Sequence, residues 1–276
     1  MGYVGCHLST HGGFMTMGEE ALGLGANTFQ FFTRNPRGAH AKQWAAADLT
    51  DFRTFVKERG FGPLVAYAPY SANPASGTME EADLARVIYS EDLARLESLP
   101  GQFYAAHPGS AVGAKSKSAA VAQVASILNE VLQPTQHSTM LLVTPAGEGN
   151  EIAATFEEMA ALLDQIDKAH DVGVCFDTAC VWGAGYDVAD DLDGVLQRFD
   201  DAIGLDRLRA VHLADPKYDR GTHHNHHAPL GEGELGWDRL VAIAKHEAIA
   251  DTVRIWETPH DDIALYAEAI KKVKRA

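Results

Sequence analysis

The stretch VGVCFDT (residues 172–178) decides the fold, because it is an apolar run that ends in an aspartate and a threonine. Seven similar runs recur along the chain: YVGCHLS (3–9), NTFQFFT (27–33), PLVAYAP (63–69), QFYAAHPG (102–109), TMLLVTP (139–145), LRAVHLAD (208–215) and VRIWETP (253–259). Short apolar runs with polar ends are typical of parallel strands that are buried on both faces. The sequence therefore predicts eight strands.

Helical patterns separate these runs. Apolar residues recur there at three- and four-residue intervals, which gives each helix one buried face. The predicted helices span residues 48–60, 79–99, 118–132, 155–170, 237–247 and 264–275. Alternating strands and helices favour an α/β fold of the (β/α)8 TIM-barrel type, for which about 250 residues is a usual length. Since no linker or change of composition divides the chain, we predict a single domain over residues 1–276.

The charge of the chain argues against general nucleic-acid binding. Its 23 basic residues face 38 acidic ones, for a net charge of −15 at pH 7. Most non-specific affinity for DNA comes from neutralising phosphates, so any DNA contact here needs a local basic rim. The three cysteines (Cys6, Cys175 and Cys180) form no disulfide framework, and the chain shows neither a signal peptide nor an apolar run long enough for a membrane span. We expect a cytoplasmic monomer without a membrane partner.

Titratable side chains stand at the predicted strand ends. They are His7, His107, Asp177, His212 and Glu257, each at the end of a different strand. In a TIM barrel, the carboxyl ends of all strands open onto one mouth, where the chemistry takes place. The sequence therefore predicts a functional site at the mouth.

Seven motifs resemble the endonuclease IV family, the zinc-dependent apurinic/apyrimidinic endonucleases with a xylose-isomerase-like TIM barrel. They are GCHLSTHGG (5–13), FFTRNPRG (31–38), AHPGS (106–110), VGVCFDT (172–178), GAGYD (183–187), HLAD (212–215) and LGEGELG (230–236). They occur in the family's order and cover the chain from end to end. The resemblance implies a TIM barrel with three zinc ions at its mouth, held by nine side chains.

Only part of that ligand set is present. Positions that match family ligands and keep the ligand type are His107, Asp177, His212, His227 and Glu257. Positions where the family ligand is replaced are Tyr67 (for His), Val143 (for the bridging Glu), Cys180 (for His) and Asn225 (for Asp). Each zinc ion needs about four ligands. By this resemblance we expect at most one zinc ion, held by Asp177, His212 and Glu257, with a metal-free pocket as the alternative.

The replacements gather at the mouth while the surrounding motifs are kept. We interpret this as an engineered or degenerate member whose pocket has been rebuilt. The family positions of Cys180, Asn225 and His227 share one metal, so these side chains should converge. The first hypothesis is then a hydrolase of an activated small-molecule ester, with Cys180 as nucleophile, His227 as base and Asn225 orienting the imidazole.

Two further residues belong to this hypothesis. A nearby imidazolium would lower the pKa of the Cys180 thiol. Tyr67 would donate to an oxyanion, and Trp256 would stack on the substrate.

Two alternatives remain open. In the first, the chain would be a divergent apurinic/apyrimidinic endonuclease that hydrolyses abasic DNA with fewer zinc ions. In the second, it would be an inert scaffold that binds a small molecule or a metal. For the first alternative, Arg37 and Tyr70 match positions where the family contacts DNA. Arg34 would join Arg37 in the local basic rim.

Overall fold

The computed structural model describes residues 2–41, 43–167 and 171–274. The last three residues of the helix predicted over 155–170, and residue 275 of the helix predicted over 264–275, lie outside the described residues.

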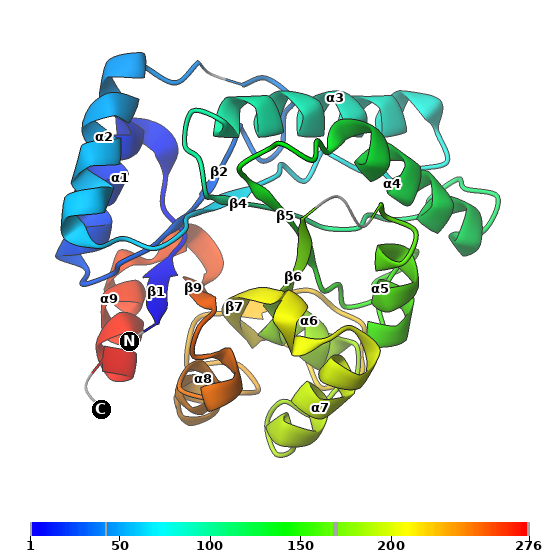
Figure 1. Cartoon of the computed structure of the whole chain (residues 1–276). Coiled ribbons are helices and arrows are strands. Elements are labelled where there is room, and N and C mark those ends of the chain that lie inside the picture. Colours follow the sequence, from blue (N-terminus) through cyan, green and yellow to red (C-terminus); the bar gives the residue numbers. More distant parts are fainter. Residues whose placement is uncertain (1, 42, 168–170, 275–276) are drawn as a thin grey trace.

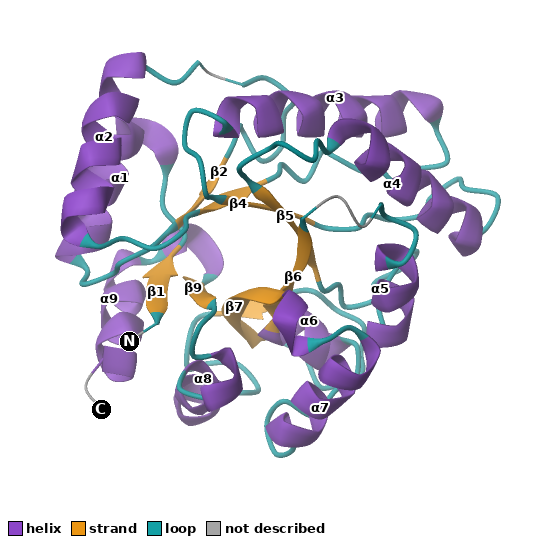
Figure 2. Ribbon diagram, in the orientation of Figure 1, coloured by secondary structure: helices purple, strands orange, loops and turns teal. Residues whose placement is uncertain are grey.

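The described strands form a nearly closed parallel barrel. In chain order they are β1 (Tyr3–Cys6), β2 (Gln30–Phe32), β3 (Val65–Tyr67), β4 (Phe103–Ala106), β5 (Thr139–Val143), β6 (Val172–Asp177), β7 (Leu208–Pro216) and β9 (Val253–Glu257). Their order around the ring is β1-β9-β7-β6-β5-β4-β3-β2. β1 and β2 meet through a parallel bridge between His7 and Gln30, which nearly closes the ring. The predicted (β/α)8 fold is confirmed, and Figure 2 shows the strands as an inner ring.

Helices cover the outside of this ring (Figure 1). They are α1 (Gly13–Gly23), α2 (Ala46–Arg59), α3 (Met79–Leu96), α4 (Lys117–Val131), α5 (Phe156–Leu163), α6 (Thr178–Gly183), α7 (Leu192–Ala202), α8 (Gly236–Ala244) and α9 (Ile263–Lys274). Short 3-10 helices are η1 (Thr10–Gly12), η2 (Leu205–Arg207), η3 (Glu247–Ile249) and η4 (Pro259–Asp261). All six predicted helices are found, although α5 ends well before residue 170, whereas α1, α6 and α7 were not predicted. In the described ranges, no helix is both long and apolar enough to traverse a bilayer.

The strands separate two apolar layers, because successive side chains of a strand point to opposite faces. In β5, Leu141 and Val143 belong to the small cluster inside the barrel, whereas Met140 and Leu142 pack in the larger cluster under the helices. Both clusters are buried. This packing holds the strand ends rigidly, so that the residues after each strand have defined positions at the mouth.

A short ninth strand shapes the mouth. β8 (His227–Ala228) pairs antiparallel with the end of β7, with Pro216 opposite His227. The following loop is held by Asp215, which is fully buried. Its carboxylate accepts hydrogen bonds at 2.9–3.1 Å from four backbone N–H groups, those of Gly231, Gly233, Leu235 and Gly236. The motif LGEGELG is therefore a loop wrapped around one buried carboxylate, and it returns the chain to α8.

Candidate functional site

Neighbouring strand ends bring acidic and imidazole side chains together. Asp177 ends β6 in register with His212 of β7, and Glu257 ends β9 opposite Ala214 of β7. His227 reaches the same mouth through β8. The parallel strand register therefore places residues that are far apart in sequence next to one another in one cluster.

The distances within this cluster suit a shared cation. His212 Nδ1 lies 3.4 Å from Asp177 Oδ2 and 3.5 Å from Glu257 Oε1. His227 Nδ1 lies 4.0 Å from Glu257 Oε2. Ligand atoms of Asp177, His227 and Glu257 all lie within 4.8 Å of one another. The structure thus adds His227 to the predicted set of Asp177, His212 and Glu257.

The electrostatics of the cluster favour positive charge. Burial by itself would raise the pKa of Asp177, but the imidazole of His212, 3.4 Å away, and the charge of His227 lower it below its ordinary value. Burial would lower the pKa of His212, but Cys175 and Glu257 raise it well above its ordinary value. Because carboxylates face His212 Nδ1 in a desolvated pocket, either a proton or a metal cation is stabilised there.

Among the described residues, buried imidazole nitrogens of this cluster and of the neighbouring His107 lack hydrogen-bond partners, which supports a metal at the mouth. Within the described ranges, His107 Nδ1, His212 Nδ1 and His227 Nε2 have no hydrogen-bond partner. Buried polar atoms nearly always have one, so such atoms indicate a missing ligand. Imidazole nitrogens and carboxylate oxygens are ligands of zinc. The residues present fit a divalent ion held by Asp177, His227 and Glu257, with the unpartnered His212 Nδ1 beside the two carboxylates.

Gln30 was missed at the level of sequence, although it lies at the centre of the cluster. Its side chain is fully buried at the start of β2. It contacts His7, His212 and Glu257 through hydrogen bonds of 3.1, 2.7 and 2.5 Å. The signal that could have revealed it is a polar amide within the apolar run NTFQFFT, where a buried amide needs partners.

The Tyr67–His107 pair, which adjoins this cluster, differs from it in chemistry. The Tyr67 hydroxyl lies 2.8 Å from His107 Nε2, and Val143 is buried inside the barrel. Burial lowers the pKa of His107 to about 4 and raises the pKa of Tyr67 well above its ordinary value, so both are neutral at pH 7. The hydroxyl predicted to serve an oxyanion is thus engaged by His107. Positions 67, 107 and 143 together offer one imidazole and no carboxylate.

The surroundings of Cys180 do not favour a thiolate. Cys180 is buried in α6, and its backbone N–H donates to Asp177 Oδ1 at 2.8 Å. Burial and the negative charge of Asp177 raise the pKa of the thiol well above its ordinary value. This is opposite to the lowering expected from a nearby imidazolium, because the closest charge is a carboxylate.

The partners expected for Cys180 make other contacts. The backbone N–H of Asn225 donates to Glu148 Oε2 at 3.3 Å, while His227 faces Glu257. In the part of the chain that the structure describes, no hydrogen bond joins His227 to the side chain of Cys180 or Asn225. The expected orienting contact between Asn225 and His227 is therefore not formed.

Trp256 does not face the mouth. It is fully buried in the outer apolar layer, with its ring 6.2 Å from that of Trp237. The expected stacking of Trp256 on a substrate is wrong, because Trp256 and Glu257 point to opposite faces of β9.

Arg37 and Tyr70 lie on two adjoining loops. Arg37 is exposed, and Tyr70 is 64% exposed. The backbone N–H of Tyr70 donates to Pro36 O at 2.9 Å, and Ser71 Oγ donates to Gly38 O at 3.3 Å. Both side chains are thus placed on one continuous rim.

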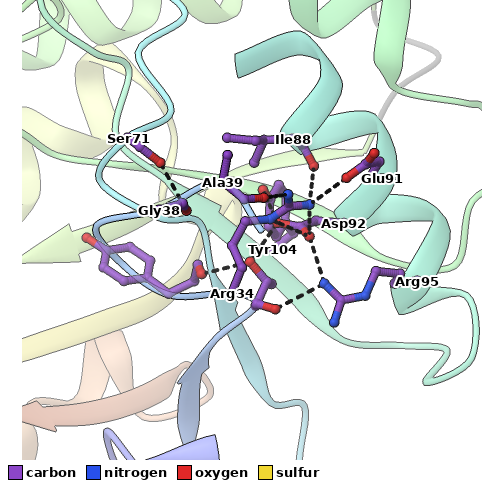
Figure 3. A network of polar contacts seen from close by, with 11 residues as sticks. Arg34, Gly38, Ala39, Ser71, Ile88, Glu91, Asp92, Arg95 and Tyr104 are labelled. Carbon is purple, nitrogen blue, oxygen red and sulfur yellow. Dashed lines mark hydrogen bonds and ion pairs between the residues drawn. The ribbon is translucent and has the colours of Figure 1, made fainter. Parts of the chain in front are cut away.

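Arg34 does not belong to this basic rim (Figure 3). Its side chain is 1% exposed, and its guanidinium forms an ion pair with the fully buried Asp92 at 2.7 Å. Asp92 also accepts hydrogen bonds from Thr33 Oγ1 at 2.6 Å and from Tyr104 Oη at 3.1 Å. Arg34 donates further to Ala39 O, which closes the loop that carries Arg37. Arg34 is therefore a structural residue beneath the rim.

Comparison with known proteins agrees with this architecture. The xylose isomerase-like TIM barrel family matches residues 19–276. A probable endonuclease 4 of Akkermansia muciniphila is 44% identical over 262 residues, which cover 95% of this chain and 94% of the relative. A probable endonuclease 4 of Alkaliphilus oremlandii is 41% identical over 273 residues, or 99% and 96% of the two chains.

A solved structure of endonuclease IV also matches the chain over nearly its whole length. The crystal structure of endonuclease IV from Thermus thermophilus has a TM-score of 0.86 and 30% identity, covering 99% of this chain and all of its own. These matches give no support to an engineered esterase. They show that the chain belongs to the endonuclease IV family of xylose isomerase-like TIM barrels.

Proposed function

We propose that this protein hydrolyses phosphodiester bonds of DNA at abasic sites with one bound zinc ion. Family membership supports the reaction class, since the relatives are named as endonucleases. The retained cluster of Asp177, His212, His227 and Glu257 supports the metal. The observation that carries the proposal is that ligand atoms of Asp177, His227 and Glu257 lie within 4.8 Å of one another, next to the buried His212 Nδ1, which has no hydrogen-bond partner in the described chain.

The residues of the cluster have distinct tasks. When bound, a divalent ion lowers the pKa of a water molecule and neutralises a phosphate oxygen. Asp177 and Glu257 supply the negative charge that holds the ion, and His212 and His227 complete a set of about four ligands. The neutral Tyr67–His107 pair lies beside them, with its hydroxyl bound to His107 Nε2, and adds no charge to the site.

The rim provides the contacts to DNA. The exposed guanidinium of Arg37 neutralises a backbone phosphate, and the exposed ring of Tyr70 offers a surface for stacking at the site of the missing base. The net charge of −15 makes this rim the part of the surface that must overcome repulsion of DNA.

The test combines metal analysis with an incision assay. The purified protein is analysed for metal content and then mixed with a duplex that carries one abasic-site analogue, with and without one equivalent of zinc. We expect about one zinc ion per chain and incision that requires it. Asp177→Asn should lower incision by at least about 100-fold, because it removes a charged ligand.

A surface aspartate serves as the matched control. Asp190 is paired with Arg239 on the surface, with its side chain 71% exposed, so Asp190→Asn should leave incision and zinc content unchanged. Zinc binding without incision would instead make the protein a metal binder. Incision that is equal in Asp177→Asn and the unmodified protein would overturn the proposal.

A further inference from the structure

Gln30 occupies an unusual position for a neutral side chain. It forms the parallel bridge with His7 that joins β2 to β1, and its side chain is fully buried. Every hydrogen-bonding group of its amide is used. Nε2 lies 2.5 Å from Glu257 Oε1 and 3.1 Å from His7 Nδ1, and Oε1 lies 2.7 Å from His212 Nε2.

The chemistry of these partners fixes the orientation of the amide. A carboxylate can only accept hydrogen bonds, so the atom of Gln30 next to Glu257 must be the NH2 group. Its second N–H then points to His7 Nδ1, and the carbonyl Oε1 is left for His212. Because a carbonyl oxygen cannot donate, His212 Nε2 must carry the proton of that hydrogen bond.

This hydrogen bond determines which nitrogen of His212 faces the mouth. With Nε2 protonated and held by Gln30, Nδ1 is directed at Asp177 Oδ2 and Glu257 Oε1, at 3.4 and 3.5 Å. The ring nitrogen that binds a metal is set by the hydrogen bond that the other nitrogen makes. We propose that Gln30 is the positioning residue of the metal site, orienting His212 and Glu257 together.

The same amide also orients the second ligand. Glu257 Oε1 is held by Gln30, and Glu257 Oε2 is left on the side of His227 Nδ1, 4.0 Å away. Val143 presents no carboxylate to share a cation with Glu257 from the neighbouring side. The hydrogen bond from Gln30 therefore fixes which oxygen of Glu257 faces His227.

The experiment separates this inference from the proposed function, on which its metal arm rests. Gln30→Met keeps the length of the side chain and removes both its donor and its acceptor groups. Zinc affinity is measured by competition with a chromogenic chelator, and we expect it to fall about 10- to 100-fold, as is usual for loss of such a partner. The second readout uses no metal: in 15N-histidine-labelled, zinc-free protein, the downfield Nε2–H proton signal of the hydrogen-bonded His212 should move upfield in Gln30→Met, because its acceptor is lost.

Two further variants sharpen the result. Gln30→Glu keeps an oxygen that accepts from His212, so it should retain the downfield Nε2–H signal. Gln102→Met is the control, because Gln102 binds the backbone of Leu64 and Pro100 before β4, away from the mouth. It should change neither readout.

The outcomes are distinct. If the unmodified protein binds no zinc, the proposed function fails, and the histidine signal alone decides the role of Gln30. A Gln30→Met protein in which the His212 Nε2–H signal keeps its chemical shift would overturn the inference, as would equal zinc affinity of this variant and the Gln102→Met control.

Discussion

His212 shows how single residues define this site. It is fully buried, its Nε2 is held by Gln30, and its Nδ1 faces Asp177 and Glu257. A raised pKa at this ring and a lowered pKa at Asp177 have the same origin, which is the pairing of opposite charges inside a desolvated pocket. In zinc-free protein, a proton on His212 occupies the place of the cation.

This pairing predicts a pH dependence of zinc binding. Since the folded pKa of His212 is raised, zinc must displace its proton, and affinity should rise about tenfold per pH unit below that pKa. Calorimetry in buffers of different ionisation enthalpy measures the released proton. Zinc binding without proton release at pH 7 would contradict the assignment.

The same shifts predict the stability of the zinc-free protein. The contribution of His212 is fully present below its unfolded pKa of about 6.5 and is lost as the pH rises through its raised folded pKa. The lowered pKa of Asp177 has the opposite sign: its contribution is present above its unfolded pKa of about 4 and is lost as the pH falls through the folded pKa. Urea unfolding measured from acidic to alkaline pH should show a loss of unfolding free energy at both ends of the range.

Cys180 should be dispensable. Its thiol is buried with a raised pKa, and its contact with Asp177 through the backbone N–H survives in Cys180→Ala. We expect incision of abasic DNA within about twofold of the unmodified protein and a loss of about 1 kcal/mol in the free energy of unfolding. Turnover of an activated aryl ester that vanishes in this variant would restore the cysteine hypothesis.

At the scale of elements, two strand ends are tied to helices by buried carboxylates. Asp177 ends β6 and also caps α6, so one oxygen binds the helix N-terminus and the other faces His212. On the other side of the barrel, Asp92 of α3 binds Arg34 and Thr33 after β2. These contacts fix the mouth and the loop of Arg37 on the strands and helices of the barrel.

Breaking the tie at α3 should be costly. Asp92→Ala leaves the guanidinium of Arg34 buried without its counter-ion, and we expect a loss of about 3–5 kcal/mol in the free energy of unfolding. Asp83→Ala on the same helix removes an exposed partner of Arg86 and should cost less than about 1 kcal/mol. Urea denaturation compares the two variants. Similar losses of unfolding free energy in both variants would show that the buried ion pair stabilises the fold no more than the exposed one.

At the scale of the whole molecule, the net charge of −15 opposes the approach of DNA. The exposed rim with Arg37 and Tyr70 must supply affinity locally, whereas the wider acidic surface repels non-specific duplex. Binding should therefore depend on few phosphate contacts, with the recognition of the abasic site adding the rest.

Salt dependence measures these contacts. Arg37→Ala should weaken binding of abasic duplex and reduce the slope of log affinity against log salt by about 1, since one phosphate contact is lost. Arg198 is exposed on α7 in the outer helical ring, so Arg198→Ala should leave the slope unchanged. Fluorescence anisotropy in metal-free buffer tests binding without cleavage. Equal slopes for the two variants would exclude Arg37 from the DNA contact.

The sequence by itself determined the barrel and most of the cluster, because apolar runs with polar ends can be recognised locally and because Asp177, His212 and Glu257 sit at strand ends. It also located His107 and His227. Tertiary structure alone decided which side chains meet. Strand register places His227 in the cluster and Gln30 between His212 and Glu257. Arg34 and Trp256 are buried away from the mouth. Burial beside Asp177 raises the pKa of the Cys180 thiol and makes it a poor nucleophile. The physical reason is that contacts and desolvation depend on neighbours that are distant along the chain.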